Sequence, residues 1–231
     1  AFEKAVNGAK KLSAAERGTL INARKIFEPE CGIGMREIPF RIVLNDIKSK
    51  QAREFASYLR AAITFYDGDF NAAGSFFSAL FKAKDHWVRE TAQYMFARNA
   101  LNQAQDNAFD EWGYFDGTRK TDDVALGKAR DGFQIYLKNW PKGQYAYSAR
   151  SLLRRVYWLG NDPAKLAAEY RWHLGAISFG ESEDLGRANH AILAEEIDSK
   201  LLPRDNGGTF GGDPLFLAVN DLMRMRKNGG Y

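Results

Sequence analysis

An aromatic and acidic segment at residues 105–121 contains the side chains best suited to binding another molecule. The sequence there, QDNAFDEWGYFDGTRKT, shows no helical or strand periodicity. Its candidate contacts for a partner are Asp110, Glu111, Trp112, Tyr114 and Phe115. Tryptophan and tyrosine contribute strongly to binding at protein interfaces, and the carboxylates would pair with basic residues of a peptide. The segment therefore predicts a peptide contact, although the same rings would also serve to fill a gap between helices.

Arginines form a second candidate site. Arg150, Arg154 and Arg155 recur on one side of a predicted helix, away from its apolar stripe. Guanidinium groups bind carboxylates strongly, so Arg154 and Arg155 are predicted anion contacts for an acidic peptide or a C-terminus. The alternative is that these arginines belong to the solvated outer face that an amphipathic helix requires.

Carboxylates at residues 181–184 suit acid–base chemistry on a cell-wall glycan. Glu181 or Glu183 would act as the general acid if one of them lay in a cleft that raised its pKa. Acidic residues also favour the first turn of a helix because of the helix dipole, so a helix start explains them without catalysis. A glycan-acting enzyme, or the helical regulatory part of one, is thus the alternative function.

Metal and cofactor chemistry is not indicated by the sequence. His86, His173 and His190 are far apart and lack the paired spacing of a metal site. Cys31 is the single cysteine, which excludes an internal disulfide and a cysteine-based zinc site. The glycine-rich stretch GGTFGG at 207–212 lacks the Lys-Ser/Thr of a phosphate-binding loop. We therefore expect no metal and no cofactor.

The composition is that of a folded protein with a mixed surface. The chain has 231 residues, 45% of them hydrophobic, which is enough for a substantial core. The formal net charge is +4, but acidic and basic residues are interspersed, so a nucleic-acid-binding patch is not predicted. No apolar run approaches the ~18 residues that span a bilayer, so no transmembrane segment is expected. The N-terminus lacks the apolar core of a signal peptide, and the sequence leaves the compartment open.

Helices must position the candidate residues, and helix signals recur along the chain. Ser13 and Glu16 form a capping box that predicts a helix start. Residues 28–40 contain two prolines and two glycines, which predicts a connector. A helical pattern resumes over residues 42–59.

The most informative helical pattern lies at residues 61–81. Small and aromatic residues recur there at spacings of three and four, on both sides of a glycine turn. This arrangement predicts two short antiparallel helices. The positions that define it are Ala61 on the first helix, Gly68 and Phe70 at the turn, and the apolar stripe Ala73, Phe77 and Leu80.

Two further hairpins follow. Ala97, in a predicted helix over 87–104, occupies the place that Ala61 holds in the first hairpin, and the partner helix is delayed by the insertion at 105–121. Asp162 and Pro163 start the second helix of a third hairpin. The second hairpin repeats the offsets of the first at Ala129, Phe133 and Tyr136, with Pro141 after them.

The C-terminal part has less regular signals. A helix is predicted over residues 185–201, a glycine-rich linker over 206–212, and a last amphipathic helix from Pro214 to about Arg226. A homodimer through this last helix is a further prediction. The residues that would form its face are Leu215, Val219, Leu222 and Met223.

Residues 54–174 resemble tetratricopeptide repeats, which have a period of about 34 residues. The stretch ARDGFQIYLKNWPKGQYAYSAR is similar to repeats of bacterial outer-membrane assembly lipoproteins of the BamD type. The resemblance implies an all-α, right-handed solenoid of helical hairpins with a concave face. It places N-terminal helices at 1–53 and atypical capping helices at 175–231, and it implies a periplasmic or outer-membrane-associated protein.

The leading functional prediction is a protein–protein interaction scaffold without catalytic activity. Stacked helical hairpins usually present a groove to a partner. We expect that groove to bind a peptide segment of another protein, in bacterial envelope assembly if the resemblance holds.

Overall fold

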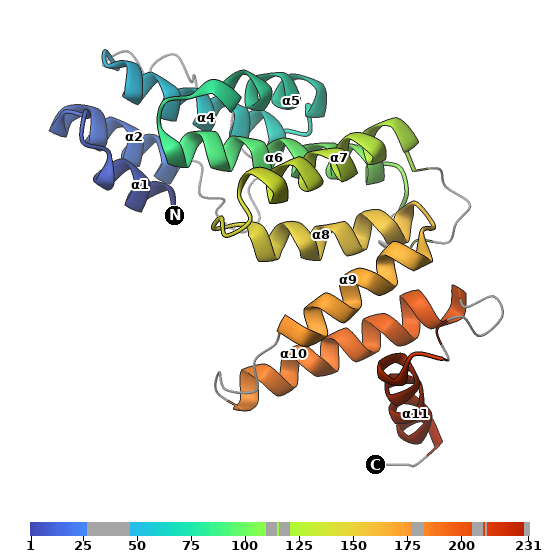
Figure 1. Ribbon diagram of the computed structural model, residues 1–231. Coiled ribbons are helices and arrows are strands. Elements are labelled where there is room, and N and C mark those ends of the chain that lie inside the picture. Colours follow the sequence, from blue (N-terminus) through green and yellow to red (C-terminus); the bar gives the residue numbers. More distant parts are fainter. Residues whose placement is uncertain are drawn as a thin grey trace. The chain divides into compact units, whose positions relative to one another are not determined.

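The structure, a computed structural model, is built from helices (Figure 1). It describes residues 1–26, 47–109, 115, 121–176, 183–204, 210 and 212–228. No β-strand occurs among these residues, which confirms the all-α prediction, whereas the right-handed solenoid stays a prediction. The chain divides into two compact units, unit 1 at Ala1–Ala146 and unit 2 at Tyr147–Tyr231.

Unit 1 begins with helices α1 (Phe2–Gly8) and α2 (Ala14–Ile26). The predicted capping box is confirmed, because the Glu16 N–H donates to Ser13 Oγ at 3.2 Å and the Ser13 N–H donates to Glu16 Oε2 at 3.0 Å. Glu16 also accepts the Ser49 N–H at 2.7 Å, which ties α2 to the start of the next described helix. Helix α1 was not predicted, because its seven residues span too few turns to show a clear periodicity.

Helices α4 (Lys50–Tyr66) and α5 (Phe70–Ala79) form the hairpin predicted at residues 61–81. Gly68 in the turn has a φ of 82°, a left-handed conformation that glycine adopts without strain. Asp69 then caps α5 by accepting the Ala72 N–H at 3.0 Å. The residues that the hairpin buries completely include the predicted Ala61, Ala73 and Phe77.

The start of α4 differs from the prediction. The helical pattern was expected over residues 42–59, but the helix begins at Lys50, where Ser49 caps it by accepting the Ala52 N–H at 3.1 Å. Serine competes well for this position because its hydroxyl satisfies an amide that has no partner within the helix. Residues 42–46 lie outside the described part of the chain.

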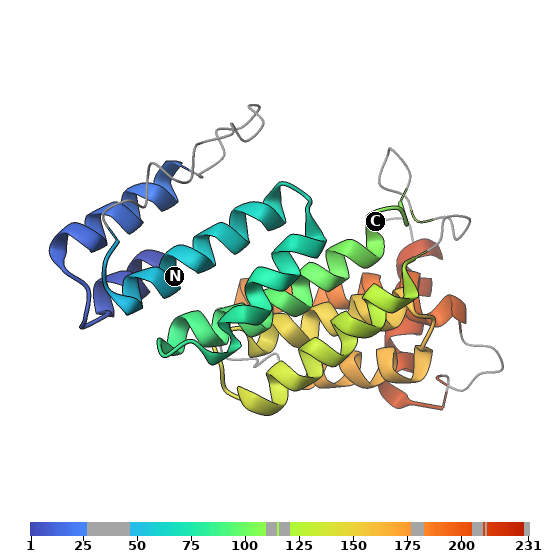
Figure 2. The same ribbon diagram turned by 90° about the horizontal axis from the view of Figure 1, so that it is seen from above.

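Helices α6 (His86–Gln105) and α7 (Asp123–Asn139) follow a short 3₁₀ turn, η1 (Leu80–Lys82). Helix α6 packs against α5 on one side and α7 on the other, and the view from above shows this order within unit 1 (Figure 2). Gly132 permits the close approach of α7 to α6, since a Cβ there would lie 2.9 Å from Ala97 Cβ. Because α6 is covered on several sides, its buried residues do not form a single stripe.

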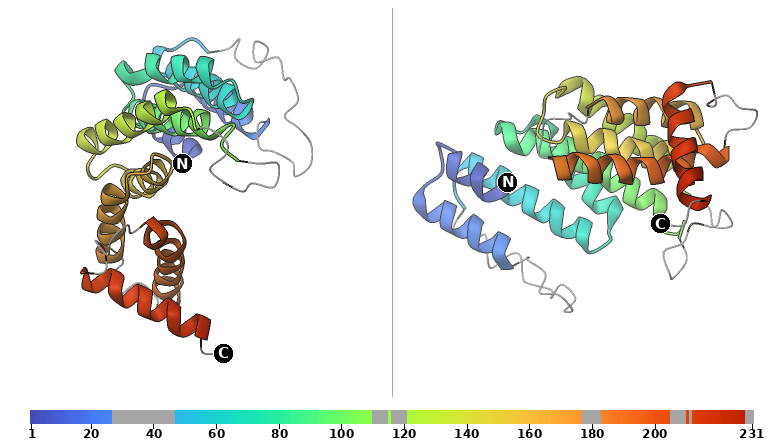
Figure 3. Two further views of the ribbon diagram at one scale, coloured as in Figure 1. Left: turned by 90° about the vertical axis from the view of Figure 1, so that its right-hand side faces the viewer. Right: turned by 90° about the horizontal axis from the view of Figure 1, so that it is seen from below.

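Unit 2 contains most of α8 (Ala146–Leu159), and α9 (Pro163–Ala176) follows it. Asp162 caps the start of α9, as predicted, because its Oδ1 accepts the Lys165 N–H at 3.1 Å. Helix α10 (Glu183–Glu196) continues as a π-helical turn, η2 (Ile197–Leu201), and a 3₁₀ turn, η3 (Leu202–Arg204). Helices α9 and α10 lie side by side, and α11 (Pro214–Asn228) crosses them steeply (Figure 3).

Candidate functional site

The predicted contacts of the insertion lie mostly outside the described residues. Asp110, Glu111, Trp112 and Tyr114 are among the residues whose structure is not described. Phe115 is half-buried, and its ring centroid lies 5.8 Å from that of Phe109. The peptide contact at this segment therefore stays a prediction.

The predicted arginine surface belongs to a polar cluster inside unit 2. Arg150 pairs with Glu169 at 3.2 Å, and Arg154 pairs with Glu196 at 3.5 Å. The Arg154 side chain is 14% exposed and lies over the Tyr170 ring at 5.4 Å, so it is not part of a solvated outer face. Burial lowers the pKa of Arg155, and the charge of Glu196 opposes this effect. The binding of an external anion by Arg154 and Arg155 remains a prediction.

His173 is the completely buried histidine of this cluster. Its Nδ1 lies 2.7 Å from the Glu169 carbonyl oxygen, and its Nε2 lies 3.1 Å from Ser151 Oγ. Burial lowers the pKa of His173 to about 4, so the ring is neutral at pH 7. Because both ring nitrogens already have neighbours within hydrogen-bonding distance, His173 is a core histidine between helices α8 and α9.

The predicted general acid and the predicted dimer face both stay predictions. Glu181 lies outside the described residues, as does the side chain of Glu183. The predicted dimer face on α11 is divided, since Val219 and Met223 are buried within unit 2 whereas Leu222 is 47% exposed.

A pocket of about 170 Å³ in unit 1 is a candidate site that the sequence did not indicate. It lies against neighbouring helices α4 and α6, the first helices of the two hairpins, and α2 contributes one side chain. We call it the tyrosine pocket. The side chains that line it include Arg24, Tyr58, Tyr66, Tyr94, Met95, Arg98 and Tyr145.

The aromatic wall of the tyrosine pocket is well ordered by packing. The rings of Tyr94 and Tyr145 stack with centroids 4.5 Å apart and planes 9° from parallel. Thr91 Oγ1 lies 3.3 Å from the Tyr145 hydroxyl, within hydrogen-bonding distance. Burial raises the pKa of Tyr145 and of Tyr58, so the phenols stay neutral at physiological pH.

A buried hydrogen-bond network holds Tyr145 in this position. The Tyr136 hydroxyl donates to Glu90 Oε1 at 2.8 Å and accepts the Tyr145 N–H at 3.1 Å. Glu90 Oε1 also accepts the Gln144 N–H at 2.8 Å. Gly143 precedes these residues, and a Cβ at Gly143 would lie only 2.5 Å from the Tyr136 hydroxyl. The turn at 140–145 therefore needs glycine, and it places Tyr145 against α6.

The tyrosine pocket is positively charged. Arg24 and Arg98 line it, and none of the described residues that line it is acidic. Within the described part of unit 1, neither arginine forms an ion pair with a carboxylate. Arg98 lies over the Phe65 ring at 5.7 Å, which supports its side chain without neutralising it. The pocket thus joins neutral aromatic walls to two cations that have no carboxylate partner in the described part of the chain.

A partial signal for this pocket exists in the sequence. Tyr58, Ala62 and Tyr66 follow each other at intervals of four on α4, which places them on one helix face. Thr91, Tyr94 and Arg98 do the same on α6 at intervals of three and four. The sequence therefore indicates these faces of α4 and α6, but their contact with α2 and with Tyr145 depends on the tertiary structure.

Comparison with known protein families, with curated proteins and with solved structures finds no match to this chain. The described residues contain no group of three or more histidine, cysteine or acidic side chains arranged to hold a metal ion. None of the described helices is both long and apolar enough to cross a membrane. The site must therefore be interpreted from its own geometry and charge.

Proposed function

We propose that unit 1 binds a peptide segment of another protein and that the tyrosine pocket receives its principal side chain. The observation that carries this proposal is the combination of aromatic walls with Arg24 and Arg98, which face the pocket without a carboxylate partner among the described residues. Aromatic residues and arginine are the types that contribute most at protein interfaces. The pocket chemistry favours a segment with an apolar side chain next to a carboxylate.

The size of the pocket favours one side chain over a whole small molecule. Its volume is about 170 Å³, whereas pockets for drug-sized ligands usually measure about 300–1,000 Å³. A single leucine or aromatic side chain fits this space, and the adjacent arginines would bind an Asp or Glu side chain or the terminal carboxylate of the segment.

The predicted repeat architecture supports the same function. If residues 54–174 form a tetratricopeptide-like solenoid, the first helices of its hairpins line the concave face, and α4 and α6 are those helices. The tyrosine pocket would then be part of the binding groove, and the aromatic insertion at 105–121 would be a second contact. A role in bacterial envelope assembly rests on the resemblance of the repeats alone.

Selection from a displayed peptide library on the full chain tests the proposal. Enriched peptides should carry an apolar residue beside Asp, Glu or a free C-terminus. Arg98→Met should weaken their binding about tenfold or more, because it removes a charge-assisted contact. Arg60→Met is the matched control, since Arg60 also lies over a phenylalanine, Phe76, but does not line the pocket. Equal binding by the two variants would refute the assignment of the pocket.

A further inference from the structure

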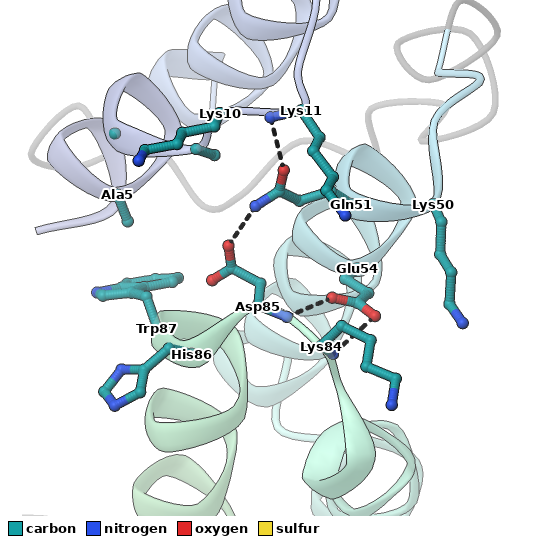
Figure 4. A pocket seen from close by; sticks show the side chains of 12 residues that line it. Ala5, Lys10, Lys11, Lys50, Gln51, Glu54, Lys84, Asp85, His86 and Trp87 are labelled. Atoms are coloured by element: carbon teal, nitrogen blue, oxygen red, sulfur yellow. Dashed lines mark hydrogen bonds between the residues drawn. The ribbon is translucent and has the colours of Figure 1, made fainter.

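A larger pocket of about 520 Å³ lies elsewhere in unit 1 (Figure 4). Three segments line it: the end of α1 and the residues after it, the first turns of α4, and residues 84–87 at the start of α6. We call it the lysine pocket. The side chains that define its character are Lys10, Lys11, Lys50, Lys84, His86 and Trp87.

Hydrogen bonds between the three segments fix the inner wall of the lysine pocket. Gln51 accepts the Lys11 N–H at 3.1 Å through Oε1 and donates to Asp85 Oδ2 at 2.7 Å through Nε2. Glu54 accepts the N–H groups of Lys84 and Asp85, each at 2.9 Å. Figure 4 shows this chain of contacts running from the end of α1 to the start of α6.

The carboxylates of the pocket are engaged by neutral donors. Both Glu54 oxygens accept backbone N–H groups. Asp85 Oδ1 accepts the Val88 N–H at 3.1 Å, and its Oδ2 accepts from the Gln51 amide. These carboxylates therefore stabilise the backbone and the cap of α6, and neither forms an ion pair with a lysine of the pocket.

The lysines of the pocket have no counterion among the described residues. Lys10, Lys11, Lys50 and Lys84 are exposed and form no ion pair with a carboxylate of the described residues. They outnumber the two carboxylates of the lining. In Figure 4 Lys10 extends from the α1 side, whereas Lys50 and Lys84 extend from the opposite side. The lysines thus lie on two sides of the pocket, so the positive charge is spread and does not lie at one point.

Packed aromatic rings form the floor of the lysine pocket. The Trp87 ring stacks on Phe55 with centroids 5.9 Å apart and planes 16° from parallel. Phe2 and Tyr58 form T-shaped contacts with the same indole, with ring centroids 5.7 Å and 5.0 Å away. Ala5 and Ala9 also line the pocket with small apolar side chains. A bound molecule would therefore meet a flat apolar surface inside a cationic rim.

We infer that the lysine pocket binds a ligand that carries two or more phosphate charges. Lysine is a common phosphate partner because its ammonium group acts as a flexible point charge. Cations from three segments suit charge spread over several phosphate groups better than one carboxylate. The volume lies within the about 300–1,000 Å³ range of small-molecule sites. This ligand site is separate from the tyrosine pocket and does not depend on the peptide proposal.

Titration calorimetry of the full chain with sodium tripolyphosphate at low ionic strength tests this inference. Wild-type protein should bind saturably, and Lys11→Gln/Lys84→Gln should weaken binding at least about tenfold, since it removes two of the surrounding charges. Lys128→Gln/Lys138→Gln is the matched control, because it lowers the net charge equally through exposed lysines of α7. The control should bind within about threefold of wild type.

Two further arms identify the phosphate source and guard against a misfolded variant. Vesicles that contain phosphatidylinositol bisphosphate test a lipid headgroup as the ligand. If the protein binds these vesicles through Lys11 and Lys84 but does not bind tripolyphosphate, the phosphate site is supported and its ligand is a membrane lipid. In wild-type protein, tripolyphosphate or these vesicles should protect the pocket lysines from acetylation, but not Lys128. Absence of binding to both probes, or equal losses in the two double variants, would overturn the inference.

Discussion

Replacement of Tyr136 by phenylalanine should destabilise unit 1 by about 3 kcal/mol. The ring is completely buried and would keep its packing. The change removes the bond from the hydroxyl to Glu90 at 2.8 Å, and hydrogen bonds to charged groups contribute about 1.5–3 kcal/mol. It also leaves the Tyr145 N–H without its acceptor at 3.1 Å, at a cost of about 1–3 kcal/mol. These two costs are not additive, because Glu90 still accepts the Gln144 N–H after the substitution. The expected loss of unfolding free energy is therefore smaller than their sum.

Urea unfolding followed by circular dichroism measures this change. Thermal unfolding should show a midpoint about 6–12 °C lower, and affinity for a selected peptide should fall because Tyr145 lines the tyrosine pocket. Tyr147→Phe is the matched control, since Tyr147 is 52% exposed and no hydrogen bond of its hydroxyl occurs among the described residues. A loss of less than about 1 kcal/mol in Tyr136→Phe would refute the role assigned to the network.

Two further variants and one NMR titration test the structure. Gly143→Ala should lower the unfolding free energy by about 2 kcal/mol or more, because the added Cβ would clash with the Tyr136 hydroxyl. Thermal melts measure this loss, and an unchanged midpoint would contradict the predicted clash. Backbone N–H groups of Ser49 and Ser13 lower the pKa of Glu16 from 4.5 to about 2, so its stabilising effect is complete above pH 4.5 and lost toward pH 2. Wild type and Glu16→Gln should therefore differ at neutral pH and converge near pH 2 in acid unfolding, and curves that stay parallel would contradict this. Burial lowers the pKa of His173 from 6.5 to about 4, so protonation favours the unfolded chain and stability falls from pH 6.5 toward 4. Its ring protons should titrate near pH 4 by NMR, and a midpoint above 6 would contradict the burial effect.

Local signals in the sequence predicted the fold best. The capping box at Ser13 and Glu16, the Gly68 turn and the Asp162 cap depend on residues a few positions apart, and the structure has all three. The start of α4 was less predictable. The apolar pattern of the sequence begins before residue 50, but the helix begins only after Ser49, which caps it through one hydrogen bond. Boundaries of this kind are decided by single side-chain contacts.

The candidate site was less predictable than the fold. The tyrosine pocket needs Arg24, Tyr94 and Tyr145 to meet from three segments, and Tyr145 is placed by a network that starts at Glu90. Helical periodicity identifies the faces of α4 and α6, but it does not say which faces meet. In the same way, the outer position expected for Arg154 from its own helix changes because Glu196 of a later helix reaches it.

A methyl NMR titration of the full chain with a library-selected peptide tests the central claim most directly. Met95 lines the tyrosine pocket, whereas Met223 is buried in unit 2, and the chain has only four methionines to assign. The Met95 methyl signal should shift saturably as peptide is added, with the same dissociation constant that calorimetry gives. Arg98→Met should reduce this shift at the same subsaturating peptide concentration, because it weakens binding about tenfold or more. A Met95 signal that stays unmoved while the peptide binds would contradict a peptide site in the tyrosine pocket.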